Sequence, residues 1–195
     1  MKRLIWFSVF LAVLVSVVPA TPALAYPQPP QYYYHSLIQN VGSALCLQPE
    51  YQAAINGLTI VQQPCDYGPY GTDLYQRWWF DTVRLDYGQP GIYLIHNSGS
   101  GQCLDDRDGR TADGSPVQRW PCNDDSTTMQ WKVIYLGFGG FQFTNMRTGK
   151  CLDVRAGSSA PGAVLQIYHC TSIPGTVNIN MAQSFGWIFT RSRNY

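Results

Sequence analysis

Residues 97–122 read NSGSGQCLDDRDGRTADGSPVQRWPC, and the landmarks of this stretch occur three times along the chain. In each case two cysteines stand 19 residues apart, an asparagine precedes the first cysteine by six residues, and a glycine follows it by eleven. The cysteine pairs are Cys46 and Cys65, Cys103 and Cys122, and Cys151 and Cys170. Such regular spacing predicts one structural unit that is used three times.

The local sequence favours short strands separated by turns. Brief apolar segments such as residues 93–95 and 141–143 alternate with Gly, Asn, Asp, Ser and Pro, and no stretch keeps a helical period. This pattern indicates an all-β fold, in which three units, each too small to bury its own core, close on one another. We expect the glycines to occupy turns and the tryptophans to fill the shared core. They are Gly57, Gly114 and Gly162, and Trp78, Trp131 and Trp187.

The N-terminal segment has the features of a secretory signal peptide. Lys2 and Arg3 precede an apolar run, and residues 23–25 read Ala-Leu-Ala, which is typical of a cleavage site. We therefore expect residues 1–25 to be removed, residues 26–33 to form an extended proline-rich leader, and residues 34–195 to form one domain. Removal of residues 1–25 changes the formal net charge from +1 to −1. A nearly neutral secreted chain indicates no general attraction to nucleic acid and no membrane insertion.

All six cysteines lie beyond the predicted signal peptide, and an even number in a secreted chain favours disulfides. Six cysteines allow 15 connectivities, but the threefold repeat favours one bridge inside each unit. The alternative, a zinc site, requires closely spaced pairs such as Cys-x2-Cys, which this chain lacks.

These repeats resemble the ricin B-type lectin family, whose unit reads Asn, then Gly-x-Cys-Leu-Asp, then Gly, then Gln-x-aromatic-x-Cys, then Gln-x-Trp. The second unit has Cys103-Leu104-Asp105 and the third has Cys151-Leu152-Asp153, and the resemblance extends over about residues 34–191. It implies a β-trefoil of three repeats with pseudo-threefold symmetry and three intra-repeat disulfides. It also implies a carbohydrate-binding module of family 13.

The resemblance implies one sugar site in the second repeat and one in the third. The site residues carried over are Asp105, Gln118 and Trp120 in the second repeat, and Asp153, Gln166 and Tyr168 in the third. A carboxylate accepts hydrogen bonds from sugar hydroxyls, an amide orients the ring, and an aromatic face packs on the apolar side of a pyranose. The first repeat has Gln48 and Gln63 at the Asp and aromatic positions, so we expect it to be structural only.

The chain departs from the family pattern at the end of each repeat. Gln-x-Trp is intact only at residues 76–78, whereas Met129 and Phe185 stand two residues before Trp131 and Trp187. The family's sugar-contacting Asn, three residues before the Trp, is replaced by Thr128 and Ser184, whose hydroxyls are candidate sugar contacts of shorter reach. Other side chains that are candidates for this role are Asn123, Asp124, Asn178 and Asn180.

No metal or cofactor is expected. The acidic run at residues 105–109 lacks the full calcium-loop pattern and its terminal Glu, so it is interpreted as a solvated loop. His35, His96 and His169 stand apart in the sequence and are interpreted as structural or surface residues.

We expect a non-enzymatic carbohydrate-binding protein of the extracellular space. A glycosidase needs two facing carboxylates, but Glu50 is the only Glu, and the Asp residues cluster in turns. The alternative is an interaction protein on the same scaffold, such as a toxin cell-binding subunit or a protease inhibitor. Its partner surface would be the inserted loop at residues 171–184, where Ile173, Val177, Ile179 and Met181 are apolar.

Overall fold

The computed structural model describes residues 35–68, 73–86, 88–137 and 140–189. The predicted signal peptide, residues 1–25, and the leader, residues 26–33, lie outside these ranges. The described residues form twelve strands. The strands are β1 (Ser36–Asn40), β2 (Cys46–Pro49), β3 (Ile60–Gln63), β4 (Arg77–Arg84), β5 (Ile92–Asn97), β6 (Cys103–Asp106), β7 (Ser115–Trp120), β8 (Trp131–Gly137), β9 (Gly140–Asn145), β10 (Cys151–Val154), β11 (Leu165–Tyr168) and β12 (Phe185–Phe189).

Six strands close into a barrel. Antiparallel pairing runs from β1 to β4, β5, β8, β9 and β12 and returns to β1. Closure leaves none of these six strands as an open sheet edge. No helix among the described residues is long and apolar enough to cross a membrane.

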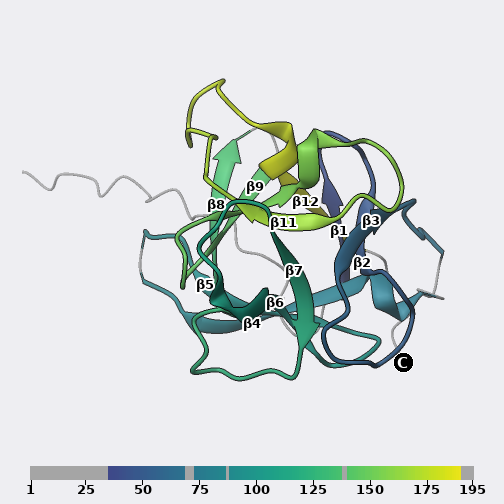
Figure 1. Ribbon diagram of the computed structural model, residues 1–195. Coiled ribbons are helices and arrows are strands. Elements are labelled where there is room, and N and C mark those ends of the chain that lie inside the picture. The colour runs from purple at the N-terminus through teal and green to yellow at the C-terminus, as the bar shows by residue number, and fades with distance from the viewer. Residues whose placement is uncertain (1–34, 69–72, 87, 138–139, 190–195) are drawn as a thin grey trace, which may run out of the picture.

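The other six strands form three hairpins, β2–β3, β6–β7 and β10–β11, one from each repeat. The hairpins contact one another through β7–β11 pairing and through isolated bridges from Thr59 to Gln118 and from Val61 to Val164. In Figure 1 the colour of the ribbon changes from purple through teal and green to yellow as one repeat follows another around the molecule. Barrel and hairpins together make the expected β-trefoil with pseudo-threefold symmetry, so the predicted fold class is confirmed.

The repeated glycines join the hairpins to one another. Gly57, Gly114 and Gly162 have φ values of 80°, 88° and 82°, a region that glycine adopts without steric cost. Their N–H groups donate to the carbonyls of Arg119, Ile167 and Gln62, each in a different repeat from the glycine itself. The predicted turn role is confirmed, and each turn also fixes one repeat against the next.

Large apolar side chains from all three repeats fill the core. Trp78 and Trp131 are fully buried, and their Nε1–H groups donate to the carbonyls of Leu47 and Leu104 at 2.9 and 3.0 Å. A buried indole N–H needs such a partner. The three predicted disulfides, Cys46–Cys65, Cys103–Cys122 and Cys151–Cys170, are all present.

The prediction that Trp187 is the core residue equivalent to Trp78 and Trp131 is wrong. Trp78 pairs with Asn97 and Trp131 with Asn145, but the matching Asn40 pairs with Phe185, not with Trp187. Phe185 is fully buried, whereas Trp187 is partly buried at the edge of the core. The third repeat therefore ends in Gln183-Ser184-Phe185, so Gln183, not Phe185, corresponds to Gln76.

Two short 3-10 helices support this correction, because each ends at the glutamine before the strand. They are η1 (Leu74–Gln76) and η4 (Met181–Gln183). Gln76 donates to the Pro64 carbonyl, and Gln183 donates to the equivalent His169 carbonyl, each at 2.9 Å. Trp187, two residues after Phe185, is therefore not the equivalent of Trp78 and Trp131.

The inserted segment of the third repeat lies on the surface (yellow in Figure 1). Ile173, Val177 and Met181 are exposed, with 53 %, 84 % and 51 % of their surface accessible. The end of the segment is different, since Gln183 and Ser184 are buried. The predicted surface loop therefore extends only to the residues before Gln183.

Candidate functional site

Two depressions lie on equivalent faces of the second and third repeats. The first has a volume of about 420 Å³ and is lined by side chains that include Asp105, Gln118, Trp120 and Thr128. The second is smaller, about 280 Å³, and Asp153, Gln166 and Tyr168 line it. The structure thus brings each predicted set of three residues together.

Strand register explains this grouping in the second repeat. Asp105 in β6 pairs with Gln118 in β7, and Cys103 pairs with Trp120, so the four side chains share the outer face of one hairpin. Gln118 Nε2 donates to Asp105 Oδ2 at 2.7 Å. The amide therefore fixes one carboxylate oxygen, while Asp105 Oδ1 has no hydrogen-bond partner in the protein.

An arginine that the sequence interpretation missed completes this arrangement. Arg107 Nε donates to Gln118 Oε1 at 2.9 Å, and Arg107 Nη2 donates to the Gly57 carbonyl at 2.6 Å. The guanidinium orients the amide so that its NH₂ group faces Asp105. The sequence signal was available, because an Arg stands two residues after the Asp in both repeats.

The third repeat has the same arrangement. Gln166 Nε2 donates to Asp153 Oδ1 at 2.8 Å, and Arg155 Nε donates to Gln166 Oε1 at 2.9 Å. Arg155 Nη2 donates to the Gly114 carbonyl at 3.0 Å, as Arg107 does to Gly57. Two repeats that differ in most of their loop sequence thus build one and the same carboxylate–amide–guanidinium array.

Burial raises the pKa of both carboxyl groups. Loss of hydration is the main cause that raises the pKa of Asp105 and of Asp153, and the hydrogen bonds from Gln118 and Gln166 oppose it. The Thr128 hydroxyl also lowers the pKa of Asp105, although it forms no hydrogen bond with Asp105 Oδ1. Each carboxylate therefore lines its depression, and Asp105 Oδ1 is a buried acceptor that has no hydrogen-bond partner in the protein.

An aromatic side chain stands at the rim of each depression. Trp120 has 42 % of its surface exposed, an unusual value for such a large apolar group. Tyr168 pairs with Cys151 just as Trp120 pairs with Cys103, and it is partly exposed. An exposed ring beside a buried carboxylate forms an apolar platform with a polar floor.

The two less certain candidates differ. Thr128 lines the depression of the second repeat, but Ser184 is buried and does not line that of the third. The register correction explains this, because the residue three positions before Phe185 is Ala182. Asn123 and Asn180, two of the alternative amides, do line the depressions of the second and third repeats, respectively.

The first repeat lacks this arrangement. Gln48 replaces the Asp, pairs with Val61, and accepts a 2.8 Å hydrogen bond from Gln76 Nε2. Gln63, at the aromatic position, pairs with Cys46. With neither a carboxylate nor an aromatic platform, this hairpin has the composition of a structural element.

The acidic run at residues 105–109 is not the solvated loop that the sequence suggested. Asp105 and Asp106 are 4 % and 0 % exposed and belong to β6, and only the residues that follow reach the surface. His96 lies inside β5 and is 8 % exposed, which fits the structural alternative of its sequence interpretation. His169 is exposed, and its Nδ1 lies 2.8 Å from Asp113 Oδ2.

Comparisons with known proteins agree with the β-trefoil fold. Residues 74–168 match the family model described as ricin-type beta-trefoil lectin domain-like. Among solved structures, the designed threefold-symmetric protein ThreeFoil is similar, with a TM-score of 0.65 and 22 % identity over 79 % of this chain and 97 % of that chain.

Two natural proteins share the fold at similar distance. The C-terminal half of the earthworm R-type lectin, solved with GalNAc, has a TM-score of 0.57 and 16 % identity over 80 % of this chain and 98 % of that one. The exo-beta-1,3-galactanase 1,3Gal43A of Clostridium thermocellum has a TM-score of 0.65 and 22 % identity over 80 % of this chain but only 30 % of that chain. The search of curated proteins finds no match.

Proposed function

We propose that this chain, which carries a ricin-type β-trefoil lectin-like domain, is a secreted carbohydrate-binding protein with one sugar site in the second repeat and one in the third. The observation that carries the proposal is the duplicated array of buried carboxylate, amide and arginine beside an exposed aromatic ring. The first repeat has no role in sugar binding, and the protein catalyses no reaction of its own.

The array suits a pyranose. The carboxylate of Asp105, which lines the depression, is the acceptor for neighbouring hydroxyl groups of the sugar, and Trp120 covers the apolar face of the ring. Gln118 and Arg107 hold the carboxylate in place before the ligand arrives, which lowers the ordering cost of binding. The same roles fall to Asp153, Gln166, Arg155 and Tyr168 in the third repeat.

A galactose-type sugar is the first class to test. The earthworm lectin was solved with GalNAc, and the Clostridium protein is named for activity on a galactan. Shallow single-sugar sites bind with about 4–6 kcal/mol, that is, with millimolar to tens of micromolar affinity. Two sites on one rigid body gain avidity on a polysaccharide or a cell-surface glycan, so these are the proposed targets.

The test is binding of the oxidised protein to an array of glycans and polysaccharides, followed by calorimetry with the best ligand. Wild type, Asp105→Ala, Asp153→Ala and the double variant are compared, with Gln48→Ala as the matched control in the first repeat. We expect each single variant to lose one site, the double variant to lose all binding, and the control to bind as the wild type does.

Near-ultraviolet circular dichroism establishes that each variant is folded. The absence of binding to any glycan by the oxidised wild type would overturn the proposal. Binding by a folded double variant that equals wild type would place the sugar elsewhere.

The second candidate function is that of a non-catalytic interaction protein, such as a toxin cell-binding subunit or a protease inhibitor. Its supporting observation is the exposure of Ile173, Val177 and Met181 on the inserted segment. Replacing these three side chains with Ser discriminates the two functions, because sugar binding should not change while binding to a protein partner should fall.

A further inference from the structure

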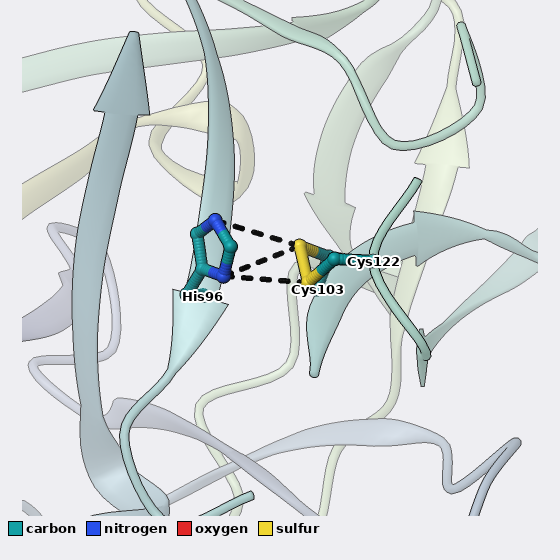
Figure 2. Close-up of side chains that lie close together, drawn as sticks. All are labelled: His96, Cys103 and Cys122. Atoms are coloured by element: carbon teal, nitrogen blue, oxygen red, sulfur yellow. Dashed lines mark hydrogen bonds between the residues drawn. A yellow bond between two sulfur atoms is a disulfide. The ribbon is translucent and has the colours of Figure 1, made fainter. Parts of the chain in front are cut away.

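A histidine lies against one of the three disulfides. His96 Nδ1 is 3.3 Å from Cys122 Sγ and 3.6 Å from Cys103 Sγ, and Nε2 is 3.8 Å from Cys103 Sγ. Figure 2 shows the imidazole on its strand facing the sulfur–sulfur bond. Strand register creates this contact, because His96 in β5 pairs with Cys103 in β6.

The pseudo-threefold symmetry supplies an internal comparison. The residue that pairs with the first cysteine is Gln39 in the first repeat and Thr144 in the third. Gln39 Nε2 lies 3.5 Å from Cys65 Sγ, and Thr144 Oγ1 lies 3.6 Å from Cys151 Sγ. All three side chains approach sulfur, but among these positions only His96 carries a group that ligates transition metals well.

We propose that reduction of the Cys103–Cys122 disulfide opens a binding site for a thiophilic divalent cation such as Zn²⁺, with His96, Cys103 and Cys122 as its protein ligands. A dithiol reductant transfers two electrons and two protons to the bridge, becoming a disulfide itself and leaving two thiols. The cation then displaces both thiol protons and binds two thiolates and one imidazole nitrogen. The inference does not depend on the proposed sugar sites.

The distances already fit two of the three ligand pairs. Zn–S and Zn–N bonds of about 2.3 and 2.0 Å at a tetrahedral angle separate sulfur from nitrogen by about 3.5 Å. The two observed Nδ1–sulfur separations, 3.3 and 3.6 Å, lie on either side of this value. Only the two sulfur atoms must move apart, from the 2.05 Å of the bond to about 3.7 Å.

The surroundings favour this chemistry. Burial is the main cause that lowers the pKa of His96, against a hydrogen bond with the Gly101 backbone that raises it, and a lower pKa favours the neutral imidazole that binds metals. Asp81 and Asp124 act in the opposite direction and place negative charge near an incoming cation. The imidazole also stacks on Trp79 with ring centroids 3.7 Å apart, which holds it beside the sulfur atoms.

Access is available on one side. Cys103 is fully buried, but Cys122 is partly exposed, so a reductant can attack the Cys122 sulfur and release Cys103. Three protein ligands leave a fourth position for water, as in open zinc sites. Sequence analysis did not predict this cluster, because its three members are not closely spaced along the chain.

The experiment opens the bridge in the whole folded protein. A limiting amount of a phosphine, which adds no thiol ligand, is used for reduction, and differential alkylation with mass spectrometry identifies the open pair. Zn²⁺ uptake is then measured, and Co²⁺ is added separately to detect thiolate-to-cobalt absorption. We expect one cation per opened second-repeat bridge and none in the oxidised protein.

The controls are His96→Gln and His96→Thr, which copy the first and third repeats. We expect each to weaken cation binding by more than about 100-fold, because even the loss of an outer-shell partner costs about 10- to 100-fold, while near-ultraviolet circular dichroism stays that of the folded chain. Equal binding by either variant, equal binding at the other opened pairs, or no binding at all would overturn the proposal. The proposal would also be overturned if the Cys103–Cys122 disulfide opened only when the chain unfolds.

Discussion

Asp106 and Val154 occupy the same position in their repeats. Each is the last residue of its strand, and neither has any exposed surface. Val154 belongs to the hydrophobic core, whereas both carboxylate oxygens of Asp106 lack a hydrogen-bond partner. Burial, together with the nearby charges of Asp105 and Asp108, raises the pKa of Asp106 from 3.8 to about 7.

This buried acid predicts that the protein is more stable at acidic pH. A carboxyl group whose pKa is raised in the folded state is neutral there at low pH, so its contribution is fully present below about pH 4. The contribution is lost as the pH rises through about 7. We expect a loss of about 2–4 kcal/mol in the free energy of unfolding across this range, measured by urea denaturation at several pH values.

The matching variants are Asp106→Asn and Asp106→Val, the second of which copies Val154. Both should remove the part of this pH dependence that Asp106 causes and raise stability at pH 8 by about 2 kcal/mol, because no charge remains to be buried at this position. The exposed Asp125→Asn is the control and should change little. Unchanged pH dependence in both Asp106 variants would contradict the assignment.

The third-repeat register makes a second prediction. Phe185 is fully buried and lies against Phe143, so Phe185→Ala should cost about 3–5 kcal/mol. Trp187 is only partly buried beside Phe141, so Trp187→Ala should cost clearly less despite the larger side chain. Thermal or urea unfolding measures both, and the reverse order would restore Trp187 as the core residue.

The exposed aromatic rings make a third prediction. Trp120→Ala should weaken sugar binding at the second repeat by about 10- to 100-fold, equivalent to about 1–3 kcal/mol, with little effect on folding, because the ring is 42 % exposed. Tyr168→Ala should do the same for the third repeat. Calorimetry on the two single variants and the double variant reports each site separately. A double variant that retains wild-type affinity would exclude stacking.

The glycine that joins the third and first repeats makes a fourth prediction. Gly162 has a φ of 82°, and no atom lies within 4 Å of a Cβ built there, so Gly162→Ala carries only a conformational cost. We expect about 1 kcal/mol of destabilisation by urea unfolding. The nearby exposed Ser159→Ala is the control, and an equally small effect in both variants would remove the requirement for a left-handed turn.

Much of the fold and of the candidate site could be predicted from the sequence, because the relevant patterns are local and occur in each repeat. The 19-residue cysteine spacing, occurring three times, predicted both the threefold fold and the disulfide pairing. Asp105 with Trp120, and Asp153 with Tyr168, were predicted from the resemblance to ricin B-type lectins, and each pair lies together because β-hairpin register converts a fixed sequence offset into position on one face.

Tertiary structure decided what sequence offset does not carry. Phe185 replaced Trp187 because a 3-10 turn sets where the strand begins, and Asp106 proved buried because closure of the trefoil places that strand end in the core. His96 meets Cys103 and Cys122 only through pairing of separate strands. Contacts of this kind depend on how elements pack against one another, which a linear pattern of residues does not specify.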